Sequence, residues 1–252
     1  DPRDVLVSRR GLTLDRLPAG AVVGTGSPRR AVQIMAVRPD LAIADIRGNV
    51  DTRLRKVADG DYDATVLAAA GLSRLGWLDR ATQVFETDQM LPAVGQGALA
   101  VQTRADDAEA VSAVSAVDHG PTRAAVTAER AFERRLGGGC HAAIAAHAVI
   151  LSATAPGARD EAPLRRPALS GAEGDPAAGG DETTSADAPP SSFLLPSSSS
   201  ERLHLRGLVG DATGTVLRAE IEGDPADAEA LGISLAERLI EQGAGAILEA
   251  AS

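Results

Sequence analysis

The chain of 252 residues contains one cysteine, Cys140, one lysine, Lys56, and only 2% aromatic residues. One cysteine closes no internal disulfide and builds no thiolate zinc site, so we expect no metal. With so few aromatics, the core has to be built from Ala, Val, Leu and Ile. No apolar run approaches a membrane span and no signal peptide opens the chain, which predicts a cytoplasmic protein. The net charge of −10 argues against nucleic-acid binding.

Strand and helix signals alternate over residues 3–91, which predicts βαβ units and a mainly parallel sheet. There we expect strands at 21–23, 41–46 and 62–69 and helices at 28–37, 50–58 and 72–75. Beyond residue 91 we expect strands at 98–102, 144–151, 203–209 and 215–221 and helices at 106–117, 121–136 and 225–242.

Residues 153–200 differ in composition from the rest of the chain. The segment holds seven of the fourteen prolines and ends in four serines. It has no hydrophobic period, so the sequence predicts a disordered insertion in a surface loop. The strands expected on either side of it would pair with each other.

The loop Gly24-Thr25-Gly26-Ser27-Pro28-Arg29-Arg30 follows a strand and opens a helix. Ser27 suits the N-cap and Pro28 the first helical position. Free backbone N–H groups at such a helix start attract an anion, and Arg29 and Arg30 add planar donors for carboxylates. By itself the motif is equally compatible with an ordinary capped helix that carries two solvated arginines.

Three more arginines follow the next two strands. Arg47 and Arg53 flank the helix start at Asn49, and Arg74 comes after the third strand. The C-terminal ends of parallel strands share one edge of a sheet, where ligands bind. The five arginines could therefore line one cleft, and an unpaired arginine cluster predicts a polyanionic partner rich in carboxylates.

The lone cysteine lies in the loop Leu136-Gly137-Gly138-Gly139-Cys140-His141. Free cysteine is often simply buried in a core, and spacing alone favours that reading. Three preceding glycines also allow close backbone approach to a ligand and an accessible sulfur.

These strings resemble the porphobilinogen deaminase (hydroxymethylbilane synthase) family. The resemblance covers residues 1 to about 150, in the family's order. It is carried by Asp1-Pro2-Arg3-Asp4, the loop at 24–30, Arg47-Gly48-Asn49-Val50-x-Thr52-Arg53-Leu54, Leu67-Ala68-x-Ala70-Gly71-Leu72-x-Arg74-Leu75-Gly76, Leu91-Pro92-Ala93-Val94-Gly95-Gln96-Gly97, and Thr127-Ala128-Glu129-Arg130-Ala131 leading to Gly138-Gly139-Cys140.

The resemblance implies a cytoplasmic, monomeric transferase of tetrapyrrole (heme) biosynthesis. It joins four porphobilinogen molecules head to tail, with release of ammonia, on a dipyrromethane cofactor held by a thioether. The anchor role falls on Cys140. The other implied contacts are Thr25, Ser27, Arg29 and Arg30 to the cofactor, and Arg47, Arg53, Arg74 and Gln96 to the substrate and the growing pyrrole chain.

The implied fold is α/β, with a periplasmic-binding-protein-like βαβ domain of mixed, mainly parallel sheet and a small α+β C-terminal domain. We expect residues 1–91 to form the second family domain, which clamps cofactor and substrate. Residues 92–118 would belong to the first domain, and 119–252 would form the C-terminal domain with the cysteine.

Two departures from the family pattern stand out. Gly26 and Pro28 replace the usual Ser and Leu of the cofactor loop. The family's Ser-x-Lys-Asp string, whose aspartate is the main acid/base, is absent, because Val57 follows the only lysine. The catalytic residue is therefore unknown, and we expect an incomplete chain that is inactive alone. The alternative is a non-catalytic, two-domain binding module for small anions, of the periplasmic-binding type.

Overall fold

The computed structural model describes residues 1–137, 142–152 and 201–250. Cys140 and the predicted insertion at 153–200 therefore lie outside the described residues. No helix in the described part is long and apolar enough to cross a membrane.

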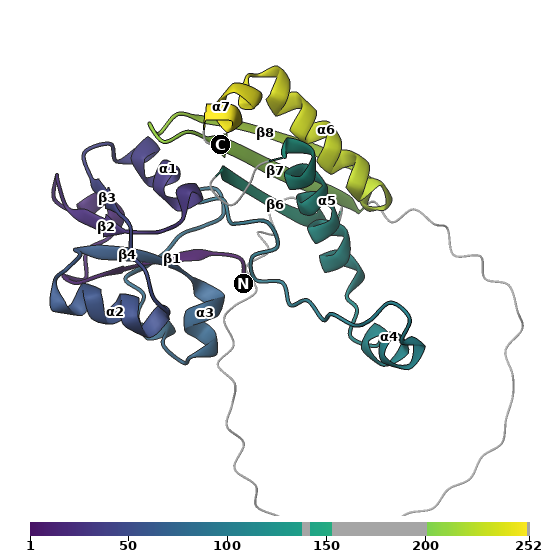
Figure 1. Ribbon diagram of the computed structural model, residues 1–252, viewed down its shortest axis with the longest axis horizontal. Coiled ribbons are helices and arrows are strands. Elements are labelled where there is room, and N and C mark those ends of the chain that lie inside the picture. Colours follow the sequence, from purple (N-terminus) through teal and green to yellow (C-terminus); the bar gives the residue numbers. More distant parts are fainter. Residues whose placement is uncertain (138–141, 153–200, 251–252) are drawn as a thin grey trace, which may run out of the picture. The chain divides into compact units, whose positions relative to one another are not determined.

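Residues 1–91 contain a five-stranded sheet of order β3-β2-β4-β1-β5 (Figure 1). Its strands are β1 (Asp4–Ser8), β2 (Val22–Gly24), β3 (Ala42–Ala44), β4 (Ala64–Ala68) and β5 (Gln83–Val84). Strand β2 pairs in parallel with β3 and β4, whereas β1 runs antiparallel to both β4 and β5. Four of the five strands thus share one direction, which confirms the mixed, mainly parallel sheet.

Helices follow the three parallel strands, as the sequence predicts. They are α1 (Pro28–Val37), α2 (Val50–Asp59) and α3 (Ala69–Arg74). Asn49 caps α2 by accepting a hydrogen bond from the Thr52 backbone nitrogen at 2.9 Å, and Gly60 ends it in the left-handed conformation. The 3₁₀ turns at Leu14–Arg16 and Leu78–Arg80 were not predicted.

Both faces of this sheet are covered, because β1 alternates its side chains between two hydrophobic clusters. Leu6 packs in a cluster with Ile34 of α1. Val5 and Val7 lie in another cluster, together with Leu54 of α2 and with α3. All five β1 residues are consequently buried, including the charged residue that opens the strand.

The second sheet is antiparallel, of order β6-β7-β8. Strands β6 (Ala143–Leu151) and β7 (Arg202–Gly210) pair along their whole length, so the two strands flanking the predicted insertion do pair with each other. Strand β8 is Val216–Gly223. The core contains Phe132 of α5 (Gly120–Leu136) and Leu235 of α6 (Ala228–Glu241). A 3₁₀ turn, Pro225–Asp227, precedes α6, and the unpredicted helix α7 (Ala244–Ala250) follows it.

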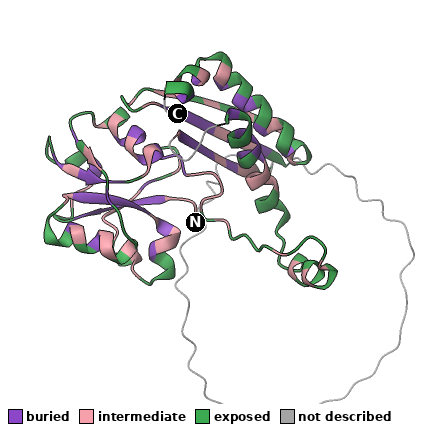
Figure 2. Ribbon diagram, in the orientation of Figure 1, coloured by how far each residue is buried: buried purple, intermediate pink, exposed green. Residues whose placement is uncertain are grey.

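The predicted strand at residues 98–102 is wrong. The segment has no strand assignment, and no strand of the described chain pairs with it. Leu99 is 81% exposed and Val101 is 62% exposed. Alternating apolar residues do not form a strand without a neighbour to complete the hydrogen-bond ladder. The following helix, α4 (Ala108–Ser115), is shorter than predicted and contains no buried residue (Figure 2).

Candidate functional site

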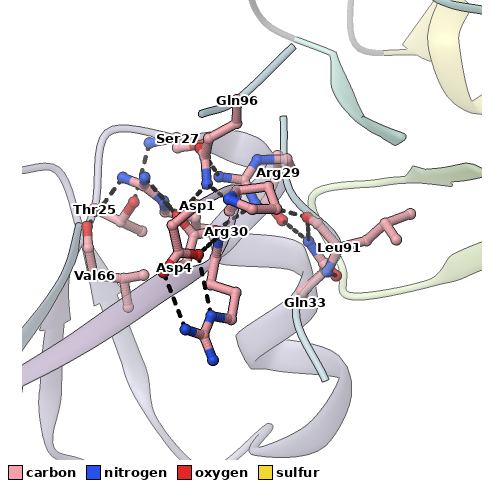
Figure 3. Close-up of polar contacts among 12 residues, drawn as sticks. Asp1, Asp4, Thr25, Ser27, Arg29, Arg30, Gln33, Val66, Leu91 and Gln96 are labelled. Carbon is pink, nitrogen blue, oxygen red and sulfur yellow. Dashed lines mark hydrogen bonds and ion pairs between the residues drawn. The ribbon is translucent and has the colours of Figure 1, made fainter. Parts of the chain in front are cut away.

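Two buried arginines share one buried carboxylate at the end of the first sheet where its parallel strands terminate (Figure 3). Arg29 donates from Nη1 to Asp4 Oδ2 at 2.7 Å. Arg30 donates from Nε and Nη2 to Asp4 Oδ1 at 3.2 and 2.8 Å. Arg29 is 4% exposed, Arg30 is 9% exposed and Asp4 is 0% exposed, so the whole cluster is removed from bulk water.

Two backbone carbonyls also accept hydrogen bonds from the two arginines. Arg30 Nη1 donates to the Val66 carbonyl of β4 at 3.0 Å, and Arg29 Nη1 also donates to the Leu91 carbonyl at 2.7 Å. No buried side-chain nitrogen or oxygen in the described part of the chain lacks a hydrogen-bond partner. The two guanidinium groups are therefore held by sheet, helix and loop together.

Two arginines against one carboxylate leave this cluster with a formal charge of +1. Burial by itself raises the pKa of Asp4, but the charges and hydrogen bonds of Arg29 and Arg30 outweigh it and leave that pKa below its usual value. Burial lowers the pKa of Arg29, and Asp4 partly offsets this effect. The lowered pKa keeps Asp4 ionised near neutral pH, and the surplus positive charge of the cluster attracts anions.

The expectation of five unpaired arginines is thus wrong for Arg29 and Arg30, and also for Arg47, which forms an ion pair with Asp45. The shared partner of Arg29 and Arg30, Asp4, was missed as a site residue. Because β1 runs antiparallel to β4, with Asp4 opposite Ala68, the start of β1 lies at the edge where β4 ends. The available signal was a charged residue, Asp4, directly before the apolar residues of β1. The local sequence does not show, however, that β1 runs in the reverse direction, which is what brings Asp4 to this site.

Beside this cluster, the start of α1 opens into a cavity of about 160 Å³. Ser27 occupies the N-cap position as predicted, but its hydroxyl makes no capping hydrogen bond. The hydroxyl of buried Thr25 instead accepts from the Ser27 backbone nitrogen at 3.1 Å. The cavity is lined by Ser27, Pro28, Arg29, Ala93, Glu133, Ala142 and Ile144. It therefore joins the helix start, buried Arg29 and Ala142, which comes two residues after Cys140 in the sequence.

Arg47, Arg53 and Arg74 lie nearer the surface than the buried pair. The Arg47 side chain is 80% exposed and donates from Nε to Asp45 Oδ2 at 2.7 Å. Half-buried Arg53 donates from Nε to the Gly48 carbonyl at 2.8 Å. Arg74 ends α3 and is exposed. Within the described ranges, neither Arg53 nor Arg74 has a carboxylate within ion-pair distance.

The parallel pairing of β3, β2 and β4 places the junctions that carry these arginines at one sheet edge. At Gly26 a built Cβ would lie 4.0 Å from Arg47 Cζ, so the α1 and α2 loops are neighbours there. Convergence of all five side chains on one cleft stays a prediction.

Gln96 supports the buried cluster from the loop after β5. Its Nε2 donates to Asp4 Oδ1 at 3.0 Å and to the Pro2 carbonyl at 2.6 Å, and its Oε1 accepts from Arg29 Nη2 at 3.4 Å. Gly97 (φ +85°) has to be glycine, because a Cβ there would lie 2.5 Å from the Asp1 carbonyl oxygen. The side-chain amide of Gln96 is already used in hydrogen bonds within the protein.

Glu129 of α5 holds this loop and was also missed by sequence reasoning. It is 5% exposed. Its Oε2 accepts from the Gly95 backbone nitrogen at 2.6 Å, and its Oε1 accepts from the Ala148 backbone nitrogen of β6 at 2.8 Å. A glutamate within the apolar face of α5 was the signal for a buried, bonded carboxylate.

A mixed α/β sheet with arginines at its strand-to-helix junctions and a net positive buried cluster is typical of an anion-binding α/β protein. A family model described as "Porphobilinogen deaminase, dipyromethane cofactor binding domain" matches residues 1–112. A second, "Porphobilinogen deaminase, C-terminal domain", matches residues 123–155. The chain belongs to the porphobilinogen deaminase family.

Curated relatives of the chain are named porphobilinogen deaminase. The porphobilinogen deaminase of Roseiflexus sp. (strain RS-1) is 41% identical over 248 residues, which cover 98% of this chain and 66% of the relative. That of Pelotomaculum thermopropionicum is 41% identical over 251 residues, 99% of this chain and 65% of the relative. That of Brevibacillus brevis is 53% identical over 150 residues, 60% of this chain and 48% of the relative. The chain thus spans just under two thirds of the length of the first two.

Proposed function

We propose that this chain supplies the cofactor-binding and much of the substrate-binding part of a hydroxymethylbilane synthase. The observation that carries the proposal is the buried Asp4–Arg29–Arg30 cluster, with its surplus positive charge, beside a cavity lined by Ser27 and Arg29. It lies within residues 1–112, the range matched by the family's cofactor-binding domain. This match favours the enzyme over the non-catalytic binding module.

The residues present fit a dipyrromethane with its acetate and propionate groups. Ser27 offers a hydroxyl that caps nothing, and the positive end of the α1 helix dipole favours carboxylates there. Arg29 lines the same cavity. We assign Cys140 as the thioether anchor on the resemblance, and Ala142, two residues later, lines the cavity.

The chain's residues divide into two roles in this proposal. Thr25 shapes the loop, and Ser27, Arg29 and Arg30 meet the cofactor's carboxylates or supply the field around them. Arg47, Arg53 and Arg74 bind the carboxylates of porphobilinogen and of the growing chain. Each added pyrrole brings two more carboxylates, and guanidinium groups keep their charge at any working pH. Gln96 acts through Asp4, to which it donates a hydrogen bond.

When bound, the dipyrromethane supplies the primer to which each porphobilinogen is joined, with release of ammonia. The protein has to bind the anionic chain, orient the incoming ring and move protons. We assign no acid/base within these 252 residues, because the family's Ser-x-Lys-Asp string does not occur in them. General acid–base help is worth about 10²–10⁴-fold in rate. We therefore propose that residues 1–252 alone do not turn over porphobilinogen.

We also propose the domain division at residues 91 and 118 and a monomeric state in the cytoplasm. Residues 92–118 would serve the domain that carries the acid/base. The exposed Leu99 and Val101 support this assignment, because apolar side chains at 81% and 62% exposure favour a covering partner surface.

Reconstitution tests the proposal. Residues 1–252 are assayed for porphobilinogen consumption alone and with a separately produced N-terminal segment of a family member that carries the Ser-x-Lys-Asp string. We expect hydroxymethylbilane only from the mixture. Turnover by the chain alone at the rate of a complete enzyme would contradict the assignment of the acid/base elsewhere. No product from a folded, stable mixture would contradict the function itself.

A further inference from the structure

Gly26 leaves room for the side chain of a neighbouring loop. A Cβ built on Gly26 would lie 2.8 Å from Asp45 Oδ1 and 3.4 Å from the Ile46 carbonyl oxygen. Gly26 is not among the glycines with positive φ, so its backbone does not itself demand glycine. The carboxylate of Asp45 therefore fills space that a side chain at position 26 would occupy.

Asp45 uses its other oxygen to hold Arg47. Asp45 Oδ2 lies 2.7 Å from Arg47 Nε, with the two side chains 53% and 80% exposed. An ion pair this exposed adds little to folding stability. Its effect is on orientation, because binding at Nε removes rotamers of Arg47 and leaves Nη1 and Nη2 as two parallel donors.

The backbone that carries this pair is anchored at three successive points. The Tyr62 hydroxyl donates to the Asp45 carbonyl at 2.7 Å. Lys56 Nζ donates to the Arg47 carbonyl at 3.4 Å, and Arg53 Nε donates to the Gly48 carbonyl at 2.8 Å. The exposed Arg47 side chain is then placed by its ion pair with Asp45.

We propose that Asp45 is a positioning residue that presents the Nη1 and Nη2 atoms of Arg47 for two-point binding of a carboxylate. Gly26 provides the space that lets Asp45 do so. The inference rests on the proposed function, because Arg47 is there assigned to the carboxylates of porphobilinogen. It explains the glycine that replaces the usual serine of the α1 loop through a contact with the α2 loop.

Holding Arg47 in place before binding removes part of the ordering cost of one long side chain, so Asp45→Ala should weaken carboxylate binding by about three- to tenfold. Gly26→Ala should act through the same contact by displacing the Asp45 carboxylate. The double variant should then bind no worse than Asp45→Ala alone. If the losses of binding free energy in the two single variants instead add up in the double variant, the two residues act separately and the proposal is overturned.

The test measures porphobilinogen binding to residues 1–252 by titration calorimetry for the wild type, both single variants and the double variant. Asp51→Ala serves as the control, since the ion pair of Asp51 among the described residues is a 4.0 Å contact with exposed Arg55. We expect an unchanged Kd for this control. An unchanged Kd for Asp45→Ala would overturn the inference while leaving the proposed function standing.

A second measurement needs no ligand. The Arg47 Nε–H resonance, assigned by its loss in Arg47→Lys, should shift in both Asp45→Ala and Gly26→Ala. Absence of a shift in both variants would overturn the inference even where the wild type binds no porphobilinogen. Failure of the wild type to bind porphobilinogen, with the shifts present, would instead count against the proposed function.

Discussion

Arg30 places two donors on one oxygen of Asp4: its Nε lies 3.2 Å and its Nη2 2.8 Å from Oδ1. The Gln96 amide reaches the same oxygen at 3.0 Å. Asp4 is thus the common acceptor for groups from α1 and from the loop after β5. The arrangement of the cofactor-side arginines depends on this single carboxylate.

Replacing Asp4 by Asn should lower the free energy of unfolding by about 3 kcal/mol. The substitution keeps the shape but leaves two buried guanidinium groups without a counter-charge, and breaking a buried pair costs about 3–5 kcal/mol. Urea unfolding measures the change. Asp106→Asn is the control, because Asp106 is exposed, and it should change the value by less than about 0.5 kcal/mol. An Asp4→Asn variant as stable as the control would show that the cluster needs no counter-charge.

The contribution of Asp4 should also disappear in acid. Its pKa is lowered in the folded protein, so the unfolded chain binds the proton first. The stabilisation is complete above the unfolded pKa of about 3.9 and is lost as the pH falls through the folded value. Over pH 6 to pH 2, the difference in melting temperature between wild type and Asp4→Asn should therefore stay constant at first and then narrow below about pH 4. A constant difference over this range would contradict the lowered pKa.

Glu129→Gln should loosen the loop that carries Gln96. A glutamine amide can accept from only one of the two backbone N–H groups now bound, Gly95 or Ala148, and its NH₂ group would face the other. The expected cost is about 1–3 kcal/mol, with faster hydrogen exchange at the Gly95 amide. Glu133→Gln, one helical turn farther at an exposed position, is the control. Unchanged exchange at Gly95 would show that Glu129 does not hold the loop.

Arg47→Lys should weaken porphobilinogen binding although the charge is kept, because an ammonium group cannot make the two-point contact of a guanidinium. We expect a loss of about tenfold, on the order of one charge-assisted hydrogen bond. Arg55→Lys, at an exposed position on the neighbouring helix, should bind as the wild type does. Equal affinities for Arg47→Lys and the wild type would remove Arg47 from the substrate site.

The spacing of apolar residues and the positions of turn-forming and capping residues predicted most of the fold. The α1 helix, expected at 28–37, is Pro28–Val37, and the strands flanking the predicted insertion pair as expected. The expected strand at 98–102 failed because a strand depends on a neighbour that local pattern does not reveal. Helix α7 was missed because its seven residues are too few for a period to be recognised.

The candidate site was predicted in its residue types but not in its pairing. Position at strand ends identified Arg29 and Arg30, yet their burial against Asp4 depends on the reversed direction of β1. Glu129 was missed as a support for a similar reason. It acts on the loop around Gly95 from helix α5, and contacts between distant segments are not encoded in local spacing.

The central claim, that this chain carries a dipyrromethane on Cys140, is tested most directly by its intact mass. The chain is incubated with porphobilinogen and the complementary N-terminal segment, and then denatured. The account predicts an added mass of two pyrrole units, each a porphobilinogen less ammonia, that survives denaturation and is absent from Cys140→Ser. Product formation with no added mass, or the same added mass on Cys140→Ser, would contradict the account.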